Sequence, residues 1–221
     1  MVGEKITYVS LFADESIHPA YEKALKDVES KYLGKHYPIY IGRDEVFSED
    51  GEFEDRSPID SSIVVGYFQR SGLSHIRRAI DIAEAAFHKW SRTDWRERVE
   101  IMKRAADIID ERKFEIAAVI TYEVGKNRLE ALAECWEAID ALRYYANIME
   151  ANNGYEKELG PGGPGEKSKM IARPYGVWVV ISPFNFPFML PNGMIQGALI
   201  TGNTVIFKPT SEAPLAGLLL Y

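Results

Sequence analysis

The 221-residue chain is acidic and rich in apolar residues, and these properties exclude several classes of protein. Its formal net charge of -7 argues against a nucleic-acid partner, because neutralising phosphates requires a clustered basic surface. Its 46% apolar content suffices for a packed core, yet no stretch approaches the roughly 20 consecutive apolar residues of a membrane span, so no membrane partner is expected.

The first seventy residues combine helical, extended and acidic segments. Residues 1–18 lack the basic region and apolar core of a signal peptide, so we expect a cytoplasmic protein. Residues 18–32 have a polar helical pattern, and residues 38–42 form a short apolar run typical of an extended segment. Acidic residues crowd 44–60, which we interpret as a solvated loop. The β-branched and aromatic residues of 61–69 predict a strand.

Three helical patterns follow this strand. Apolar residues recur at three- and four-residue steps over 76–90 and again over 95–109, and Asp94 is a typical helix-start residue. Gly125 interrupts the pattern before a third series over 129–146. These patterns predict a helical layer whose apolar stripes form the core.

Cys135 is the only cysteine, which excludes an intrachain disulfide and favours a reducing compartment. It lies in a helical pattern with neither a nearby histidine nor a strand-to-helix elbow. We therefore interpret it as an inert helical residue and not as a nucleophile.

Residues 151–173 are rich in glycine, proline and charge, which indicates a connection or a hairpin that leaves the main body. Gly160, Gly162 and Gly165 formally match the dinucleotide-binding pattern GxGxxG. No buried strand precedes them, no convincing helix follows, and two prolines between them remove amide donors. We interpret them as a flexible turn.

The pattern changes after this connection. Residues 175–183 are a continuous apolar and β-branched run, 187–203 are helical, 204–207 are a second short apolar strand, and 211–221 begin another helix. Strand, helix, strand and helix in this order predict parallel pairing with right-handed crossovers, and hence an α/β fold.

A polar residue follows each of these two strands. Asn185 lies between aromatic and proline residues beyond the first strand, and Lys208 ends the second. The carboxyl ends of parallel strands are where α/β proteins bind ligands. A neutral amide suits a developing oxyanion, and an ammonium suits ribose hydroxyls or phosphate. On these residues alone, a turn-closing asparagine and a solvated lysine are equal alternatives.

Residues 173–214 carry several motifs in register: P-Y-G-V at a strand start, P-F-N-F-P, a helix ending in G-N, and a strand ending in K-P. This pattern resembles the aldehyde dehydrogenase family. Residues 56–71 resemble the family's early hairpin, and W-R-E-R with the helices after it resembles its helical layer. Residues 123–146 are similar to one branch, the 1-pyrroline-5-carboxylate dehydrogenases, which oxidise L-glutamate γ-semialdehyde to L-glutamate in proline degradation.

The resemblance implies a cofactor site. Lys208 matches the lysine that bonds the adenosine ribose, and Ser182, Pro183 and Phe184 match backbone around the nicotinamide. Ser211 stands where many NAD-preferring members have a glutamate that repels a 2′-phosphate. The expected cofactor is therefore NAD, with NADP not excluded. No metal site is expected.

The resemblance also implies a substrate site for a small aldehyde. Asn185 matches the amide of the oxyanion hole, and Phe186 resembles an aromatic wall of the semialdehyde pocket. Glu137 matches, in a loosely aligned helix, a carboxylate near the substrate's amino group, and a solvated glutamate is an equal alternative.

In the family, the nucleophilic cysteine, the general-base glutamate and the glycine turn under the pyrophosphate all follow the segment found here. We therefore expect an incomplete aldehyde dehydrogenase fold. Residues 1–150 form a mostly helical part of the cofactor domain with a small hairpin, and 151–173 form a connecting or oligomerisation hairpin. Residues 174–221 begin a Rossmann-like NAD-binding sheet, and the catalytic domain is absent.

On this interpretation the chain alone is inactive, and a polypeptide carrying the C-terminal half is a possible partner that completes the fold. The full enzyme is expected to be a homo-oligomer. Two alternatives remain: a non-catalytic dinucleotide-binding or assembly module, and a dehydrogenase for succinate semialdehyde or another small aldehyde.

Overall fold

A computed structural model describes residues 15–221 of the chain. Residues 15–72 contain one helix and five short strands: α2 (Ile17–Lys31), β1 (Lys35–Tyr37), β2 (Ile39–Ile41), β3 (Asp44–Val46), β4 (Glu52–Arg56) and β5 (Val64–Gln69). Strands β1, β5 and β4 form a mixed sheet with β5 in the centre, and β2 pairs with β3 as a separate hairpin. The expectation about a signal peptide concerns mainly residues 1–14, which lie outside the described residues.

The acidic stretch 44–60 is not simply a solvated loop, and that prediction is wrong for β3 and β4. β4 pairs antiparallel with β5 and turns alternate residues inward, so that Asp55 is buried while its neighbours are exposed. Phe53 packs its ring 5.8 Å from that of Phe68 across the pair. Buried and exposed residues alternate along β4, but its acidic composition does not reveal this alternation because only one face of the strand is covered.

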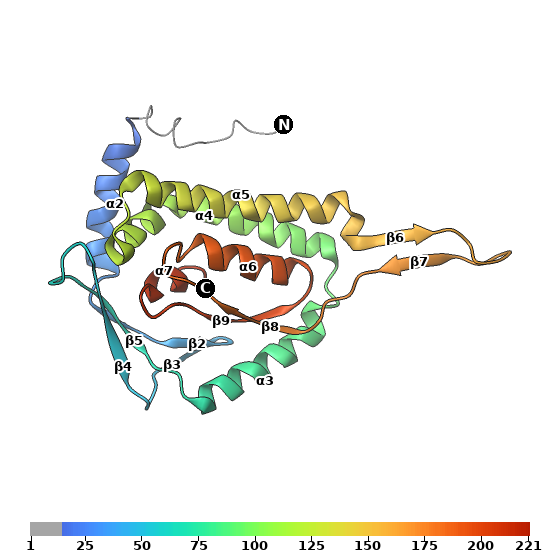
Figure 1. Cartoon of the computed structure of the whole chain (residues 1–221), viewed down its shortest axis with the longest axis horizontal. Helices are drawn as coiled ribbons and strands as arrows, with labels where there is room; N and C mark the ends of the chain where they lie inside the picture. The colour runs from blue at the N-terminus through green and yellow to red at the C-terminus, as the bar shows by residue number, and fades with distance from the viewer. Residues whose placement is uncertain (1–14) are drawn as a thin grey trace.

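Three helices form the layer predicted from their apolar periodicity: α3 (Leu73–Trp90), α4 (Trp95–Val124) and α5 (Arg128–Ala151). Asp94 caps α4 as predicted, since its side chain accepts a hydrogen bond from the backbone N–H of Arg96 at 2.8 Å. α4 and α5 run side by side as an antiparallel hairpin around Gly125, and their facing sides form the largest part of the core (Figure 1).

Cys135 lies in this core with its side chain fully buried. Burial raises the pKa of its thiol well above the ordinary value, so the thiolate is disfavoured. The helical position predicted for Cys135 is confirmed, and its inertness, which this burial favours, stays a prediction.

A two-stranded hairpin, β6 (Glu156–Leu159) and β7 (Ser168–Ile171), follows the short 3₁₀ helix η1 (Asn153–Tyr155) and projects away from the body (Figure 1). The glycines of the formal GxGxxG match lie in its tip, between the two strands. They precede no helix, as the interpretation of a turn requires.

The chain then forms β8 (Val177–Ile181), α6 (Met189–Ile200), β9 (Thr204–Lys208) and the short helix α7 (Pro214–Leu218). β8 and β9 pair in parallel, as predicted, with Val177 opposite Thr204 and Ile181 opposite Lys208. α6 lies between this pair and the α4–α5 hairpin, and α3 lies on the other side (Figure 1). No helix among residues 15–221 is long and apolar enough to cross a membrane.

Candidate functional site

The parallel register of β8 and β9 brings their carboxyl ends together. Ile181 and Lys208 are opposite residues, and the backbone N–H of Ser182 donates to the carbonyl of Lys208 at 3.3 Å. The two polar positions predicted from the strand ends therefore lie at the same end of the sheet: Lys208 is the last residue of β9, and Asn185 is in the loop after β8. We call this surface at the carboxyl ends of β8 and β9, formed by residues 182–186 and 208–213, the strand-end edge.

The loop after β8 presents both a buried hydroxyl and exposed groups. Ser182 is buried, and its Oγ has no hydrogen-bond partner in the structure. Pro183, Phe184 and Asn185 are exposed, with Phe184 at 59%. A buried hydroxyl without a partner is uncommon in folded proteins, which makes Ser182 a suitable contact for a bound molecule.

The loop after β9 is polar and open. The Nζ of Lys208 is exposed and donates to the carbonyl of Pro209 at 3.0 Å, which leaves further donors on the ammonium. Ser211 and Glu212 are exposed beside it. A flexible ammonium and a hydroxyl at this position suit the hydroxyl or phosphate groups of a nucleotide.

Phe186 is half-buried where the strand-end edge meets the α4–α5 hairpin. The Nζ of Lys126 lies 3.4 Å from the centroid of its ring, which is a close cation–π contact. Glu137 is exposed on α5, and no hydrogen bond or ion pair among residues 15–221 joins it to Asn185 or Phe186. The structure therefore unites the predicted positions from Ser182 to Phe186 with Lys208 and Ser211, and does not add Glu137 to them.

Sequence reasoning missed two buried glutamates beneath this edge, Glu123 and Glu134. Both contact the backbone at the start of a helix that follows one of the two strands. A signal for Glu134 was present, because it lies three residues after Ala131 and four before Ala138, on the buried stripe of α5. A charged residue on such a stripe indicates a specific buried partner.

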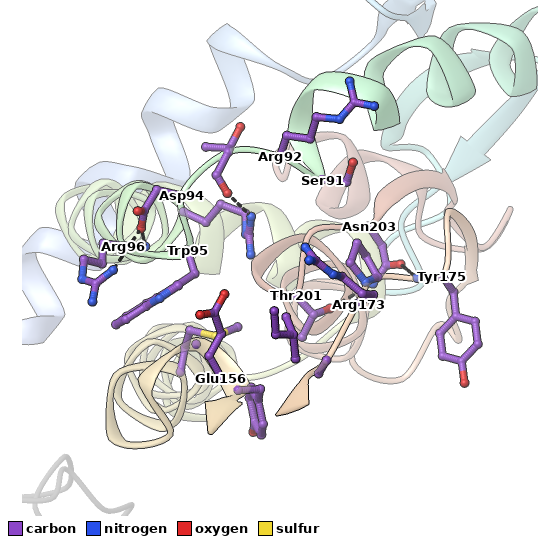
Figure 2. Close-up of a pocket in the computed structure, with 18 of the residues that line it drawn as sticks. Ser91, Arg92, Asp94, Trp95, Arg96, Glu156, Arg173, Tyr175, Thr201 and Asn203 are labelled. Carbon is purple, nitrogen blue, oxygen red and sulfur yellow. Dashed lines mark hydrogen bonds and ion pairs between the residues drawn. The ribbon is translucent and has the colours of Figure 1, made fainter. Parts of the chain in front are cut away.

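At the amino ends of β8 and β9, the side chain of Asn203 fixes the backbone that precedes β8. Its Oδ1 accepts from the backbone N–H groups of Tyr175 and Gly176 at 2.7 and 3.0 Å. A cavity of about 820 Å³ opens at this end, between the start of α4 and the base of the β6–β7 hairpin (Figure 2). Arg98 lines it and donates to the carbonyl of Ile200 at 2.9 Å. This cavity lies at the far end of the strands from Asn185 and Lys208.

The family model described as the aldehyde dehydrogenase family matches residues 46–221. The chain belongs to the aldehyde dehydrogenase family. Among curated members, it is 40% identical over 205 residues to the 1-pyrroline-5-carboxylate dehydrogenase of Anoxybacillus flavithermus, and 38% identical to that of a Geobacillus species. Each alignment covers 92% of this chain and 39% of the relative, so the chain spans about two fifths of these aldehyde dehydrogenases.

Comparison with solved structures gives the same result. The 1-pyrroline-5-carboxylate dehydrogenase from Thermus with bound NAD is 34% identical with a TM-score of 0.88, covering 100% of this chain and 42% of that one. Proline utilization A from Bdellovibrio bacteriovorus is 32% identical with a TM-score of 0.88, covering 95% of this chain and 21% of that one. The α/β architecture of residues 15–221 is therefore that of the front part of the family fold.

Proposed function

We propose that the chain is the cofactor-side part of an NAD(P)-dependent dehydrogenase that oxidises L-glutamate γ-semialdehyde to L-glutamate in proline degradation. The observation that carries the proposal is the strand-end edge, where exposed Asn185, unpartnered Ser182 and Lys208 come together. The names of the relatives and the NAD in the Thermus structure support the choice of substrate and cofactor.

This proposal assigns a role to the residues of the strand-end edge. Bound NAD supplies the hydride acceptor. Lys208 holds the adenosine ribose, and the loop from Ser182 to Phe184 contacts the nicotinamide end. Asn185 donates its amide to the aldehyde oxygen as negative charge develops there, and Phe186 covers one side of the substrate. Ser211 leaves space for a 2′-phosphate, so NADP is a secondary cofactor.

The chain alone is proposed to lack turnover. Aldehyde oxidation in this family needs a cysteine thiolate, and the only cysteine here is buried Cys135 with a raised thiol pKa. A polypeptide that carries the C-terminal part of the family fold is the proposed partner, and the β6–β7 hairpin is the proposed oligomerisation element. A cytoplasmic location remains a prediction of the sequence.

The first experiment follows NAD reduction with L-glutamate γ-semialdehyde, using the 221-residue chain alone and then mixed with a polypeptide that supplies the C-terminal part. We expect turnover only in the mixture. In that mixture Asn185→Ala should lower kcat by roughly 10²-fold, the usual cost of removing one oxyanion donor. Asn147→Ala, on the exposed face of α5, is the matched control and should leave kcat unchanged.

Semialdehyde-dependent NADH formation by the chain alone would refute the part of the proposal that concerns inactivity. Turnover in the mixture with succinate semialdehyde but not with L-glutamate γ-semialdehyde would replace the substrate. Absence of turnover with both, with NAD still bound, would favour a non-catalytic dinucleotide-binding or assembly module.

A further inference from the structure

Hydrogen bonds to Glu134 connect the loop that carries Asn185 to the α4–α5 hairpin. Glu134 is fully buried in α5, and its Oε1 accepts hydrogen bonds from the backbone N–H groups of Phe188 and Met189 at 2.9 and 3.0 Å. These amides begin α6 and have no partner within that helix. A single carboxylate oxygen thus fixes the backbone three and four residues beyond Asn185.

The other oxygen of Glu134 extends this connection to Phe186. Its Oε2 lies 2.7 Å from the Nζ of Lys126, which also covers the Phe186 ring. Lys126 is located in the turn between α4 and α5. The α4–α5 hairpin therefore holds both the ring that precedes α6 and the backbone at its start.

Glu123 makes the equivalent contact for the second loop. It is buried at the end of α4, and its two oxygens accept one hydrogen bond each, from the N–H groups of Leu215 and of Ala216, the latter at 2.7 Å. The short helix α7 that begins there packs back on the loop, since a Cβ added at Gly217 would lie 2.8 Å from the Cβ of Pro209. Fixing α7 therefore fixes the residues that follow Lys208.

We propose that Glu134 and Glu123 are positioning residues, each of which aligns one loop of the strand-end edge. Glu134 sets the place of Asn185 and Phe186, and Glu123 sets the place of Lys208 and Ser211. The inference rests on the proposed function for its kinetic consequences. Because the two glutamates serve different loops, they have different effects: Glu134 acts on the chemical step, and Glu123 acts on cofactor affinity.

The geometry also predicts which glutamine substitutions are tolerated. In Glu134→Gln the amide oxygen can still accept both N–H groups, because one oxygen of Glu134 accepts both in the wild type, but the side-chain NH₂ then faces the ammonium of Lys126 and the ion pair is lost. In Glu123→Gln the side-chain NH₂ must face the backbone N–H of either Leu215 or Ala216. Both groups are donors, so that hydrogen bond is lost. Glutamine at position 134 should therefore keep both backbone contacts and lose only the Lys126 ion pair, whereas glutamine at position 123 should lose one of its two backbone contacts.

The kinetic test uses the chain completed by the C-terminal polypeptide. Glu134→Ala should lower kcat about tenfold with the KM for NAD unchanged within about twofold, and Glu134→Gln, which keeps the two backbone contacts, should lower kcat less than Glu134→Ala. Glu123→Ala and Glu123→Gln should both raise the KM for NAD about tenfold with little loss of kcat. Lys103→Met is the matched control, because Lys103 also lies 2.7 Å from a glutamate, Glu150, but on the hairpin surface.

Hydrogen exchange on the chain alone tests positioning independently of activity. Glu134→Ala should speed exchange of the amides of 186–190 and leave 213–218 unchanged, and Glu123→Ala should do the reverse. Equal acceleration of both segments, or parallel changes in kcat and KM for both glutamates, would overturn the inference. If the wild-type mixture has no turnover, the proposed function fails, and the exchange pattern alone decides the positioning role.

Discussion

Asp55 and Glu123 bring two carboxyl groups together where β4 meets α4. Burial, followed by the charge of Glu212, raises the pKa of Asp55 to about 7. Burial also raises the pKa of Glu123 well above its ordinary value, and the charge of Asp55 adds to this increase. Hydrogen bonds with the backbone of Arg56 and the side chain of Glu123 lower the pKa of Asp55 and offset part of this increase, whereas its Oδ2 has no hydrogen-bond partner in the structure.

This raised pKa predicts a pH-dependent stability. Between the ordinary carboxyl pKa and about 7, the folded state binds more protons than the unfolded state, so the free energy of unfolding falls as pH rises. Asp55→Asn removes this titration. Relative to the wild type, its free energy of unfolding should increase from pH 5 to pH 8 by roughly 1–3 kcal/mol, measured by urea denaturation at each pH.

Asp140→Asn on the exposed face of α5 is the control for this measurement and should follow the wild-type pH dependence. Because the charge of Asp55 also raises the pKa of Glu123, the difference between Asp55→Asn and the wild type reports Asp55 together with its effect on Glu123. Parallel curves for Asp55→Asn and the wild type would show that Asp55 titrates as an ordinary carboxyl group.

Gly125 forms the turn between the two longest helices, α4 and α5. It ends the 30-residue α4 with a left-handed backbone, φ 75°, and its N–H donates to the carbonyl of Thr121 at 3.0 Å. A Cβ added there would lie 3.3 Å from the Cγ of Pro58. This turn places Glu123 and Glu134 on neighbouring helices, so the geometry of one element positions both.

Gly125→Ala should lower the free energy of unfolding by about 1–2 kcal/mol, because the left-handed conformation is costly for a residue with a Cβ. Urea denaturation measures the change. Gly193→Ala is the matched control, since Gly193 lies inside α6 and its nearest neighbour is the hydroxyl of Tyr145 at 4.0 Å. That variant should be neutral or slightly stabilising, and an equal loss in both would exclude the backbone explanation.

The elements that sequence reasoning found are those with a strong local signal. The apolar periodicity of α3, α4 and α5 and the continuous apolar runs of β8 and β9 each have one dominant interpretation, and the structure agrees. β4 was missed because only its inward face is apolar or buried, and acidic residues dominate its composition. Its pairing with β5 is a tertiary property that no local pattern contains.

The strand-end edge was predictable for a related reason. The order strand, helix, strand fixes which ends of β8 and β9 meet, so Asn185 and Lys208 followed from topology. The hydrogen bonds of the two buried glutamates beneath them could not be predicted in this way. Glu134 and Phe188 are 54 residues apart in the sequence, and Glu123 and Leu215 are 92 residues apart. Contacts at such separation depend on the packing of α5 and α4 against later elements.

The whole molecule leaves an apolar surface uncovered at β8. Within residues 15–221 this strand pairs only with β9, so its other edge has no neighbouring strand. Val179 and Ile181 lie on one face of β8 and are 62% and 65% exposed, whereas Val180 on the other face is buried. An open strand edge beside exposed apolar side chains favours association with another chain.

We therefore expect the 221-residue polypeptide, prepared alone, to self-associate through β8, with a sedimentation coefficient that increases with protein concentration. Val179→Lys/Ile181→Lys should weaken this association roughly tenfold or more, because each tenfold change requires only about 1.4 kcal/mol. Ile76→Lys/Ile108→Lys is the matched control, since it adds the same charge at exposed apolar positions on α3 and α4. Equal weakening by both pairs would indicate that charge repulsion, and not the β8 surface, controls the association.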